Sequence, residues 1–245
     1  MALAGVAACA APVSSGINDP YEDENRVRHE FNRNLDRALV GPASRGLAQG
    51  VPGPVTSGVS NFADNLSEPR HFVNHALQGN VEGAIMNTLR FAVNTTVGLG
   101  GLIDMASALG MPEFDTDFGE TLHTWGVGEG AYVELPVFGP STQRDVAGRA
   151  VDFFLNPLTG SLPKPEKYYA TGVNIAARVA DRGQFSGTVD SVLYDSADSY
   201  AQTRLMYLQN RRFELGGGSD ADYDDPYATG NDPMYEDPYD DPYAE

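Results

Sequence analysis

Apolar residues in this chain recur every three or four positions, in short blocks that glycine and proline interrupt. One series runs from Val27 through Phe31 and Leu35 to Leu39. Such spacing puts apolar side chains on one face of a helix, and no long run alternates apolar with polar residues as a half-buried strand does. The pattern predicts an all-α fold of many short amphipathic helices. The spacing recurs at Val55, Val59, Phe62 and Leu66 and at Val81, Ile85, Leu89 and Val93.

Capping and helix-breaking residues set the predicted ends of these helices. Asn18 or Asp19 is expected to cap the first helix, with Pro20 in its first turn, and Gly41 and Pro42 are expected to end it. A further helix is expected to start at Ser67, Glu68 and Pro69 and to end at Gly79, and the next helix is expected to start at Asn80.

The second half of the chain predicts tight loops followed by longer helices. Residues 95–139 are rich in glycine, and residues 132–136 are the best candidate for an extended segment. Ser141 is expected to cap a helix that reaches about Phe154, with Phe153 and Phe154 facing inward. Two longer helices are expected at about 165–182 and 196–213, the second with Tyr200, Leu205, Tyr207 and Leu208 on its apolar side.

Charge and hydropathy limit the partners of the chain. No stretch approaches the roughly 18 apolar residues of a spanning helix, so the body is expected to sit in water or lie against lipid. The net charge is −18, and residues 219–245 contribute −10 of it. An acidic chain is repelled by phosphate backbones, which argues against nucleic-acid binding. The proline-rich acidic segment 216–245, which repeats Asp-Pro-Tyr, is expected to be a disordered tail that solubilises the chain, recruits a basic partner or binds calcium weakly.

The N-terminus predicts a lipid anchor. Cys9 is the single cysteine, and it follows Val6, Ala7 and Ala8 in the pattern of a lipobox. Acylation would give the lone thiol a use, and two or three acyl chains anchor a protein durably. The alternative is that Cys9 is an ordinary residue of a leader. Ala10 stands where Asp would favour retention in the inner membrane. The predicted organisation is a signal remnant and tether at 1–17, a helical domain at 18–215 and the tail.

A series of different short motifs occurs one after another along residues 18–157. They are Asn18-Asp19-Pro20, Asn25-Arg26, Phe31-Asn32, Asp36, Ser60-Asn61-Phe62, Asn65-Leu66, Glu68-Pro69, Asn74 and Leu77-Gln78-Gly79. They continue with Arg90-Phe91, Asn94-Thr95, Gly98, Gly100-Gly101, Ile103-Asp104, Phe118-Gly119, Thr121-Leu122, Gly126-Val127-Gly128, Gly130, Tyr132-Val133, Leu135-Pro136, Gly139 and Arg144-Asp145. Jointly they resemble the MlaA (VacJ) family.

The resemblance implies a fold and a function. Members of that family are outer-membrane lipoproteins facing the periplasm, and their ring-like helical body lies in the inner leaflet around an amphipathic central channel. They associate with a trimeric porin, remove phospholipids mislocalised to the outer leaflet, and pass them to a soluble periplasmic lipid carrier. This activity maintains outer-membrane lipid asymmetry and needs no cofactor or catalytic residue.

The resemblance also implies functional positions. Phe31 and Asn32 lie where the family places its first helix at the channel rim, so they are candidates for a gate, against ordinary helix packing. Asp23 and Glu24 depart from the family, which usually has glycine and an aromatic residue there. Positions carried over as family motifs are Asn25, Arg26, Asn61, Phe62, Pro69, Gly100, Gly101, Phe118, Gly119 and Gly128.

Other chemistries find little support in the sequence. His71, His75 and Glu68 share a helix face, but a His-Glu-x-x-His pattern is absent, so no metal site is predicted. A Gly-x-Ser-x-Gly nucleophile elbow is also absent, which argues against a lipase. The remaining alternative is a structural or adhesive envelope lipoprotein that uses its helices as a scaffold and its tail as a ligand.

Overall fold

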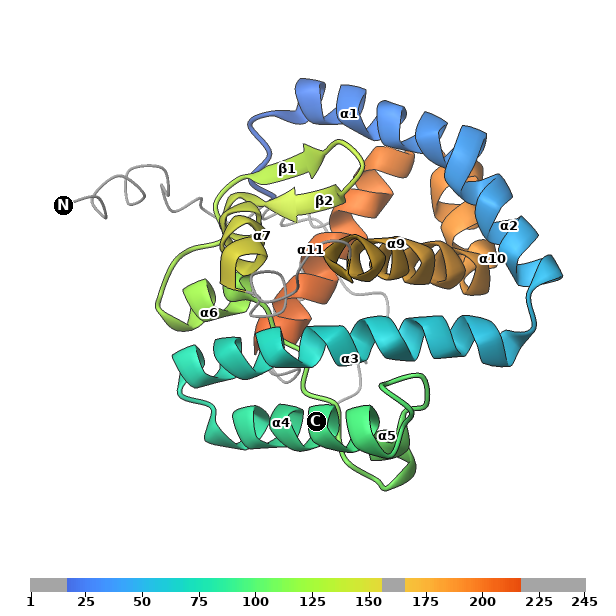
Figure 1. Cartoon of the computed structure of the whole chain (residues 1–245). Helices are drawn as coiled ribbons and strands as arrows, with labels where there is room; N and C mark the ends of the chain where they lie inside the picture. The colour runs from blue at the N-terminus through green and yellow to red at the C-terminus, as the bar shows by residue number, and fades with distance from the viewer. Residues whose placement is uncertain (1–16, 156–165, 217–245) are drawn as a thin grey trace, which may run out of the picture.

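The computed structural model describes residues 17–155 and 166–216, and these residues are mostly helical (Figure 1). This confirms the predicted all-α class, with one small hairpin added. The elements are α1 Glu22–Leu35, η1 Asp36–Val40, α2 Gly41–Gly50, α3 Gly53–Gln78, α4 Val81–Thr96, α5 Met105–Ala108, α6 Phe118–Thr124, β1 Tyr132–Leu135, β2 Gly139–Thr142, α7 Gln143–Leu155, α9 Glu166–Gln184, α10 Ser186–Asp190, η2 Ser191–Asp195 and α11 Ser199–Gly216.

The predicted boundary between α3 and α4 is confirmed. Gly79 ends α3 in the left-handed conformation, with φ +74°, and the Asn80 side chain accepts a hydrogen bond from the Gly83 backbone N–H. The cap predicted for the first helix is wrong, because Tyr21 occupies the N-cap position without a side-chain bond. Asp19 instead accepts hydrogen bonds from Tyr200 and Arg204 of α11.

Two predicted helix breaks are wrong because the helices run through them. At Gly41 and Pro42 the chain passes from α1 through the π-helical segment η1 into α2, and the Gly41 N–H bonds the Asp36 carbonyl. Pro42 lies in the first turn of α2, where a missing N–H costs little. Pro69 lies inside α3 instead of opening a helix. Since α3 packs on both α4 and α9, tertiary contacts outweigh the local cost of the proline.

The predicted extended segment is β1, which pairs with β2 in an antiparallel hairpin. The register joins Tyr132 to Thr142 and Leu135 to Gly139. Tyr132 lies in a small apolar cluster with Tyr200 and Leu208 of α11, and Tyr207 packs against it, which confirms these three residues of the predicted apolar side. The hairpin is thereby attached to the interior, while its turn projects outward.

The helices form a ring-like body. Figure 1 shows α1, α2 and α3 as successive sides of a frame, with α9 lying within it. Contacts of α9 with both α2 and α3 support this arrangement, and α1 meets the hairpin while α11 meets β2 and η2. Among the described residues, no helix combines the length and the apolar character needed to cross a bilayer.

The apolar side chains at helical spacing are unusually exposed to the surroundings. Val27, Phe31 and Leu39 are 72%, 52% and 63% exposed. The prediction that Phe153 and Phe154 face inward is wrong, because these side chains are exposed at the end of α7. Their helix buries Arg144, Asp145 and Asp152 on the opposite side, so the polar face takes the interior.

Two predictions lie outside the described residues. Cys9 and the tether precede residue 17, and the acidic tail follows residue 216.

Candidate functional site

The interior of the described part is mainly polar. Its buried side chains comprise 21 polar or charged residues against nine apolar ones, which reverses the usual preference for apolar burial. Buried polar groups are costly unless they are hydrogen-bonded. The partners of these groups therefore show how the interior is built.

Arg90 of α4 organises the first polar cluster. Its guanidinium, 2% exposed, donates from Nε to Glu68 Oε1 at 3.0 Å and from Nη1 to the Met111 carbonyl at 3.0 Å. Its Nη2 also faces Asp104 and Glu113. Burial opposes ionisation of Asp104, but hydrogen bonds from Ser107 and Asn94 and the Arg90 charge lower its pKa to about 2. This cluster connects α4 to α3 and to residues 104–113, which belong to the glycine-rich part of the chain.

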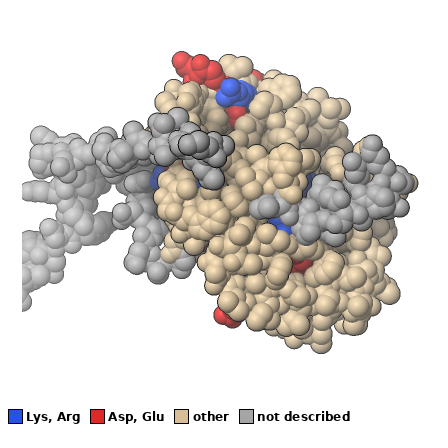
Figure 2. Space-filling model, turned by 60° about the vertical axis from the view of Figure 1, so that its left-hand side comes forward, with Lys and Arg blue, Asp and Glu red and all other residues tan. Residues whose placement is uncertain are grey.

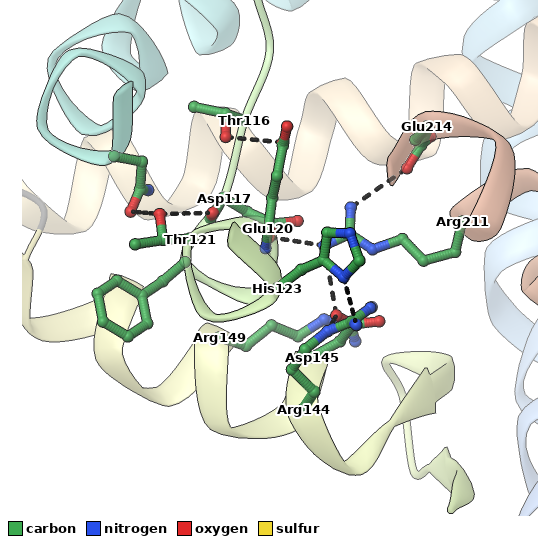
Figure 3. A network of polar contacts seen from close by, with 12 residues as sticks. Thr116, Asp117, Glu120, Thr121, His123, Arg144, Asp145, Arg149, Arg211 and Glu214 are labelled. Atoms are coloured by element: carbon green, nitrogen blue, oxygen red, sulfur yellow. Dashed lines mark hydrogen bonds and ion pairs between the residues drawn. The ribbon is translucent and has the colours of Figure 1, made fainter. Parts of the chain in front are cut away.

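Figure 3 shows a second cluster, which joins α6, α7 and α11. Arg211 Nη2 donates to Asp117 Oδ1 at 2.7 Å and to Asp145 Oδ1 at 3.3 Å. Burial alone would raise the pKa of Asp145, but the Tyr207 hydroxyl, Arg211 and Arg144 together hold it below its usual value. Asp145 stays ionised and holds the three helices together.

A third cluster fastens α9 to the bend between α1 and α2. Arg182 donates from Nε and Nη2 to the two carboxylate oxygens of Asp36 at 2.9 and 2.8 Å, and Tyr194 donates to Asp36 Oδ2 at 2.7 Å. Arg182 Nη2 also reaches Asp190 at 2.5 Å. Asp36 lies in η1 and Tyr194 in η2, so this cluster connects two π-helical segments, which are often found at functional sites.

Two asparagines of α1 hold the hairpin by the same contact. Asn25 Nδ2 donates to the Tyr132 carbonyl at 3.2 Å, while its Oδ1 accepts from the Glu134 N–H at 2.9 Å. Two turns later, Asn32 Nδ2 donates to the Leu135 carbonyl at 2.9 Å, and its Oδ1 accepts from the Val137 N–H at 2.7 Å. Each amide thus bonds one carbonyl and one N–H of the hairpin, as a neighbouring strand would.

A serine, a histidine and a glutamate meet near this contact without forming a catalytic triad. His29 Nε2 lies 3.0 Å from Ser199 Oγ, but His29 Nδ1 is 3.6 Å from Glu134 Oε1 and makes no hydrogen bond. Tyr132 and Asn32 bond the Glu134 carboxylate instead. The Ala201 N–H of α11 is bonded to Asp198 and so is not a free oxyanion donor.

The histidines considered for a metal site have separate partners. His75 Nε2 bonds the Phe114 carbonyl, His71 lies beside Arg70, and Glu68 bonds Arg90 and Asn87. Burial, with the charges of Arg70 and His75, lowers the pKa of His71 to about 3. Within residues 17–155 and 166–216, no group of three His, Cys, Asp or Glu side chains is placed to hold a metal ion.

The predicted motif residues fall in five different regions, one of which is the loop between α4 and α5 that contains Gly100 and Gly101. Asn25, Arg26, Phe31 and Asn32 lie on α1, where Arg26 pairs with Glu22 and Asp198. Asn61, Phe62 and Pro69 lie on α3, and Asn61 donates to the Leu102 carbonyl at 3.2 Å. Phe118 and Gly119 begin α6, and Gly128 lies in open space in the following loop. The gate assigned to Phe31 and Asn32 stays a prediction.

Close packing of neighbouring residues accounts for Gly101 and Gly119. Gly101 has φ +99°, and an added Cβ would lie 2.7 Å from Asn65 Cβ. At the contact of α6 and α7, a Cβ added to Gly119 would lie 2.5 Å from Asp145 Oδ1, and one added to Gly148 would lie 2.4 Å from the backbone nitrogen of Gly119. A structural role is therefore sufficient for both positions.

Several central residues are absent from the sequence-based site prediction. His29, Arg182, Tyr194 and Arg211 were not assigned roles, although each contributes to a polar cluster. A signal for α1 is present in the sequence, because Asn25, His29, Asn32 and Asp36 recur at helical spacing opposite the apolar stripe. Arg182 of α9 and Arg211 of α11 do not belong to a comparable series of polar residues at helical spacing.

The outer surface complements this polar interior. Outside the atoms drawn in grey, Figure 2 shows a face with few charged side chains. Between α3 and α4 lies an apolar groove of about 450 Å³, lined mainly by Phe72, Ala76, Val81, Ala84, Ile85 and Leu89. Large exposed apolar areas mark surfaces that contact lipid or a partner.

Comparisons with known proteins agree with this geometry. The sequence model of the MlaA lipoprotein family matches residues 17–214 of the chain. The chain is 36% identical to the Escherichia coli Intermembrane phospholipid transport system lipoprotein MlaA, over 87% of this chain and 84% of that protein. It is 35% identical to the Haemophilus influenzae protein of the same name, over 82% and 80% of the two chains. A solved structure from work on the structural basis for maintenance of bacterial outer membrane lipid asymmetry is 34% identical, with a TM-score of 0.67, over 80% of this chain and 98% of that one.

Proposed function

Because the chain belongs to the MlaA lipoprotein family, we propose that it removes mislocalised phospholipids from the outer leaflet of the outer membrane. The helical body passes them inward through an amphipathic channel, and this maintains the lipid asymmetry of the membrane. The observation that carries the proposal is the reversed polarity of the molecule, with hydrogen-bonded polar clusters inside and apolar stripes outside.

This polarity fits a body that lies within one leaflet. A phospholipid needs a polar path for its headgroup and an apolar one for its acyl chains. Outward apolar side chains on α1 and α4 suit contact with acyl chains. The polar interior would lower the barrier to headgroup passage, so no covalent step is required, and we infer that the chain is not an enzyme.

We further propose two partners and an anchor. A trimeric porin would hold the body in the outer membrane, and a soluble periplasmic lipid carrier would receive the phospholipid and give the transfer its direction. Diacylated Cys9 would fix the chain to the periplasmic side of the outer membrane. Palmitate labelling should be lost in Cys9→Ser and kept in Cys9 wild type, whereas labelling of both would contradict the anchor.

The transport function is tested in a deletion strain. Phospholipid should accumulate in the outer leaflet, measured by palmitate transfer to lipid A or by accessibility to external phospholipase, and detergent with chelator should become more toxic. The full-length gene should restore both phenotypes. Unchanged outer-leaflet composition in the deletion strain would contradict the proposal.

The alternative role of a structural or adhesive scaffold gives a different result. A scaffold encloses no lipid, so the protein purified from membranes should then carry no phospholipid above that of a control lipoprotein. Bound phospholipid, measured by mass spectrometry and displaced by added lipid, is the result expected for a transport protein.

A further inference from the structure

The turn between β1 and β2, residues 135–139, projects two apolar side chains into the surroundings. Val137 is 67% exposed and Phe138 is 61% exposed. The segment contains no charged residue. Its base is anchored, since Leu135 pairs with Gly139 and Tyr132 lies in the buried cluster with Tyr200. We call residues 135–139 the apolar turn.

The backbone of the apolar turn is held in an unfavourable conformation. Val137 has φ +71°, in the left-handed region, which a β-branched residue rarely adopts. Such a conformation persists when surrounding contacts impose it, and it occurs preferentially at functional sites. The neighbouring contact is on α1, where Asn32 Oδ1 accepts the Val137 N–H at 2.7 Å.

Asn32 uses its whole amide on this segment. Its Nδ2 donates to the Leu135 carbonyl at 2.9 Å and to Glu134 Oε1 at 3.0 Å, in addition to the bond from Val137. Asn25 fixes the start of β1 in the same way, so α1 sets both the register and the outward direction of the turn.

The apolar turn lies beside a helix that also exposes apolar side chains. Phe31 precedes Asn32 on α1 and is half exposed, and Val27 of α1 and Leu39 of η1 are more exposed still. Asn32 contacts the turn directly, so the tip lies beside α1.

We propose that the apolar turn inserts Val137 and Phe138 into the acyl-chain layer of a phospholipid leaflet, and that Asn32 positions it for insertion. The occupant of this surface is lipid, because the tip is uncharged and apolar and lies beside α1, which exposes apolar side chains of its own. The proposal rests on the transport function in one respect, since it assumes that the body lies in a membrane.

A single tryptophan reports insertion. Trp125 is the only tryptophan, so full-length Trp125→Phe provides a background for Phe138→Trp. Ile85→Trp, at an exposed position of α4, reports embedding of the body. Each protein is reconstituted in phosphatidylethanolamine and phosphatidylglycerol vesicles with or without brominated acyl chains. Tryptophan at 138 should be quenched as strongly as tryptophan at 85.

The two reporters separate the possible failures. Quenching at 85 without quenching at 138 overturns the insertion of the turn and leaves membrane embedding intact. Absence of quenching at both positions overturns the insertion and also contradicts the proposed location of the body.

The positioning role of Asn32 is tested in the same reporters. Asn32→Asp removes the donation to Leu135 and places a carboxylate beside Glu134, so quenching at 138 should fall while quenching at 85 persists. The matched control is Asn34→Asp, because Asn34 is exposed on α1 and its Nδ2 donates to Glu30. Undiminished quenching at 138 in Asn32→Asp overturns the positioning role.

A final pair of variants does not depend on the stability of Asn32→Asp. Phe138→Ser changes an exposed side chain and should weaken vesicle binding severalfold, whereas Phe138→Leu should preserve it. Both are made with Cys9→Ser so that an acyl anchor does not mask the difference. Equal binding of the two variants overturns the insertion.

Discussion

At the scale of single residues, the protein is stabilised by buried charges that have several partners each. Asp36 is bonded by Arg182 and Tyr194, and Arg90 bonds Glu68 and faces Asp104. Removing one partner leaves another charge buried without compensation, which costs more than the intact pair contributes. Substitutions at these positions should therefore have large effects.

Asp36→Asn should lower the free energy of unfolding by about 3 kcal/mol, because it leaves buried Arg182 without its main carboxylate partner. Urea unfolding at pH 7 measures this. Burial opposes the ionisation of Asp36, but hydrogen bonds from Arg182 and Tyr194 hold its pKa below the usual value. Its stabilising contribution is therefore present at neutral pH and is lost as pH falls below about 4 through the folded-state pKa. The matched control is Asp198→Asn, which breaks the exposed pair with Arg26 and should cost less than about 1 kcal/mol.

Asp64→Asn should have the opposite sign. Partial burial and the nearby carboxylates of Glu113 and Asp115 raise the pKa of Asp64 to about 6. A raised carboxyl pKa means that ionisation opposes folding, so its cost appears as pH rises from about 4 to 6 and is complete at pH 7. Because Asp64 remains accessible to solvent, the variant should gain at most about 1 kcal/mol at pH 7. Unfolding at pH 7 and pH 4 checks this, and an equal gain at both values would contradict it.

At the scale of elements, helix junctions depend on contacts that local sequence does not contain. Gly41 and Pro42 were expected to end a helix, yet the chain continues through η1 into α2. In η1, Asp36 accepts a hydrogen bond from Arg182 of α9, which lies more than a hundred residues further along the chain. The end of α3 was predicted correctly because Gly79 and Asn80 act locally. Local signals therefore set some helix ends, and distant partners overrule others.

Gly148→Ala tests the contact between α6 and α7. Its Cβ would lie 2.4 Å from Gly119 N, and overpacking against backbone should destabilise the protein by about 1 to 3 kcal/mol. Gly172→Ala is the control, because Gly172 lies within α9 with nothing near its added Cβ. That change should stabilise by up to about 1 kcal/mol. Thermal unfolding compares the two, and similar effects of the same sign would contradict the close contact.

At the scale of the whole molecule, the polar and apolar faces are exchanged relative to an ordinary soluble protein. Helix α4 buries Asn87, Arg90 and Asn94 and exposes Ile85 and Leu89. In a membrane leaflet this arrangement suits the surroundings, because acyl chains cover the outer stripes while the polar clusters remain paired inside. Stability is therefore carried by the inward polar face of these helices, and the proposed membrane contact by their outward apolar face.

A double variant, Ile85→Glu with Leu89→Glu, should weaken membrane association without unfolding the body. Each carboxylate placed among acyl chains costs about 1 to 3 kcal/mol, so vesicle binding of the Cys9→Ser chain should fall at least about tenfold. Circular dichroism should be unchanged. Gln184→Glu, at an exposed polar position, is the control and should bind as the parent does. Unchanged binding of the double variant would contradict the lipid-facing assignment of α4.

The sequence by itself determined the all-α class, the cap at Asn80, the extended segment at β1 and the family, because periodicity, capping and ordered motifs are local properties of the chain. It also contained both the apolar and the polar stripe of α1. Only the tertiary structure decided which stripe faces inward, since periodicity describes two faces and does not orient them. It also decided the partners of Asn32, Asp36 and Arg182, because those bonds join residues far apart in the chain.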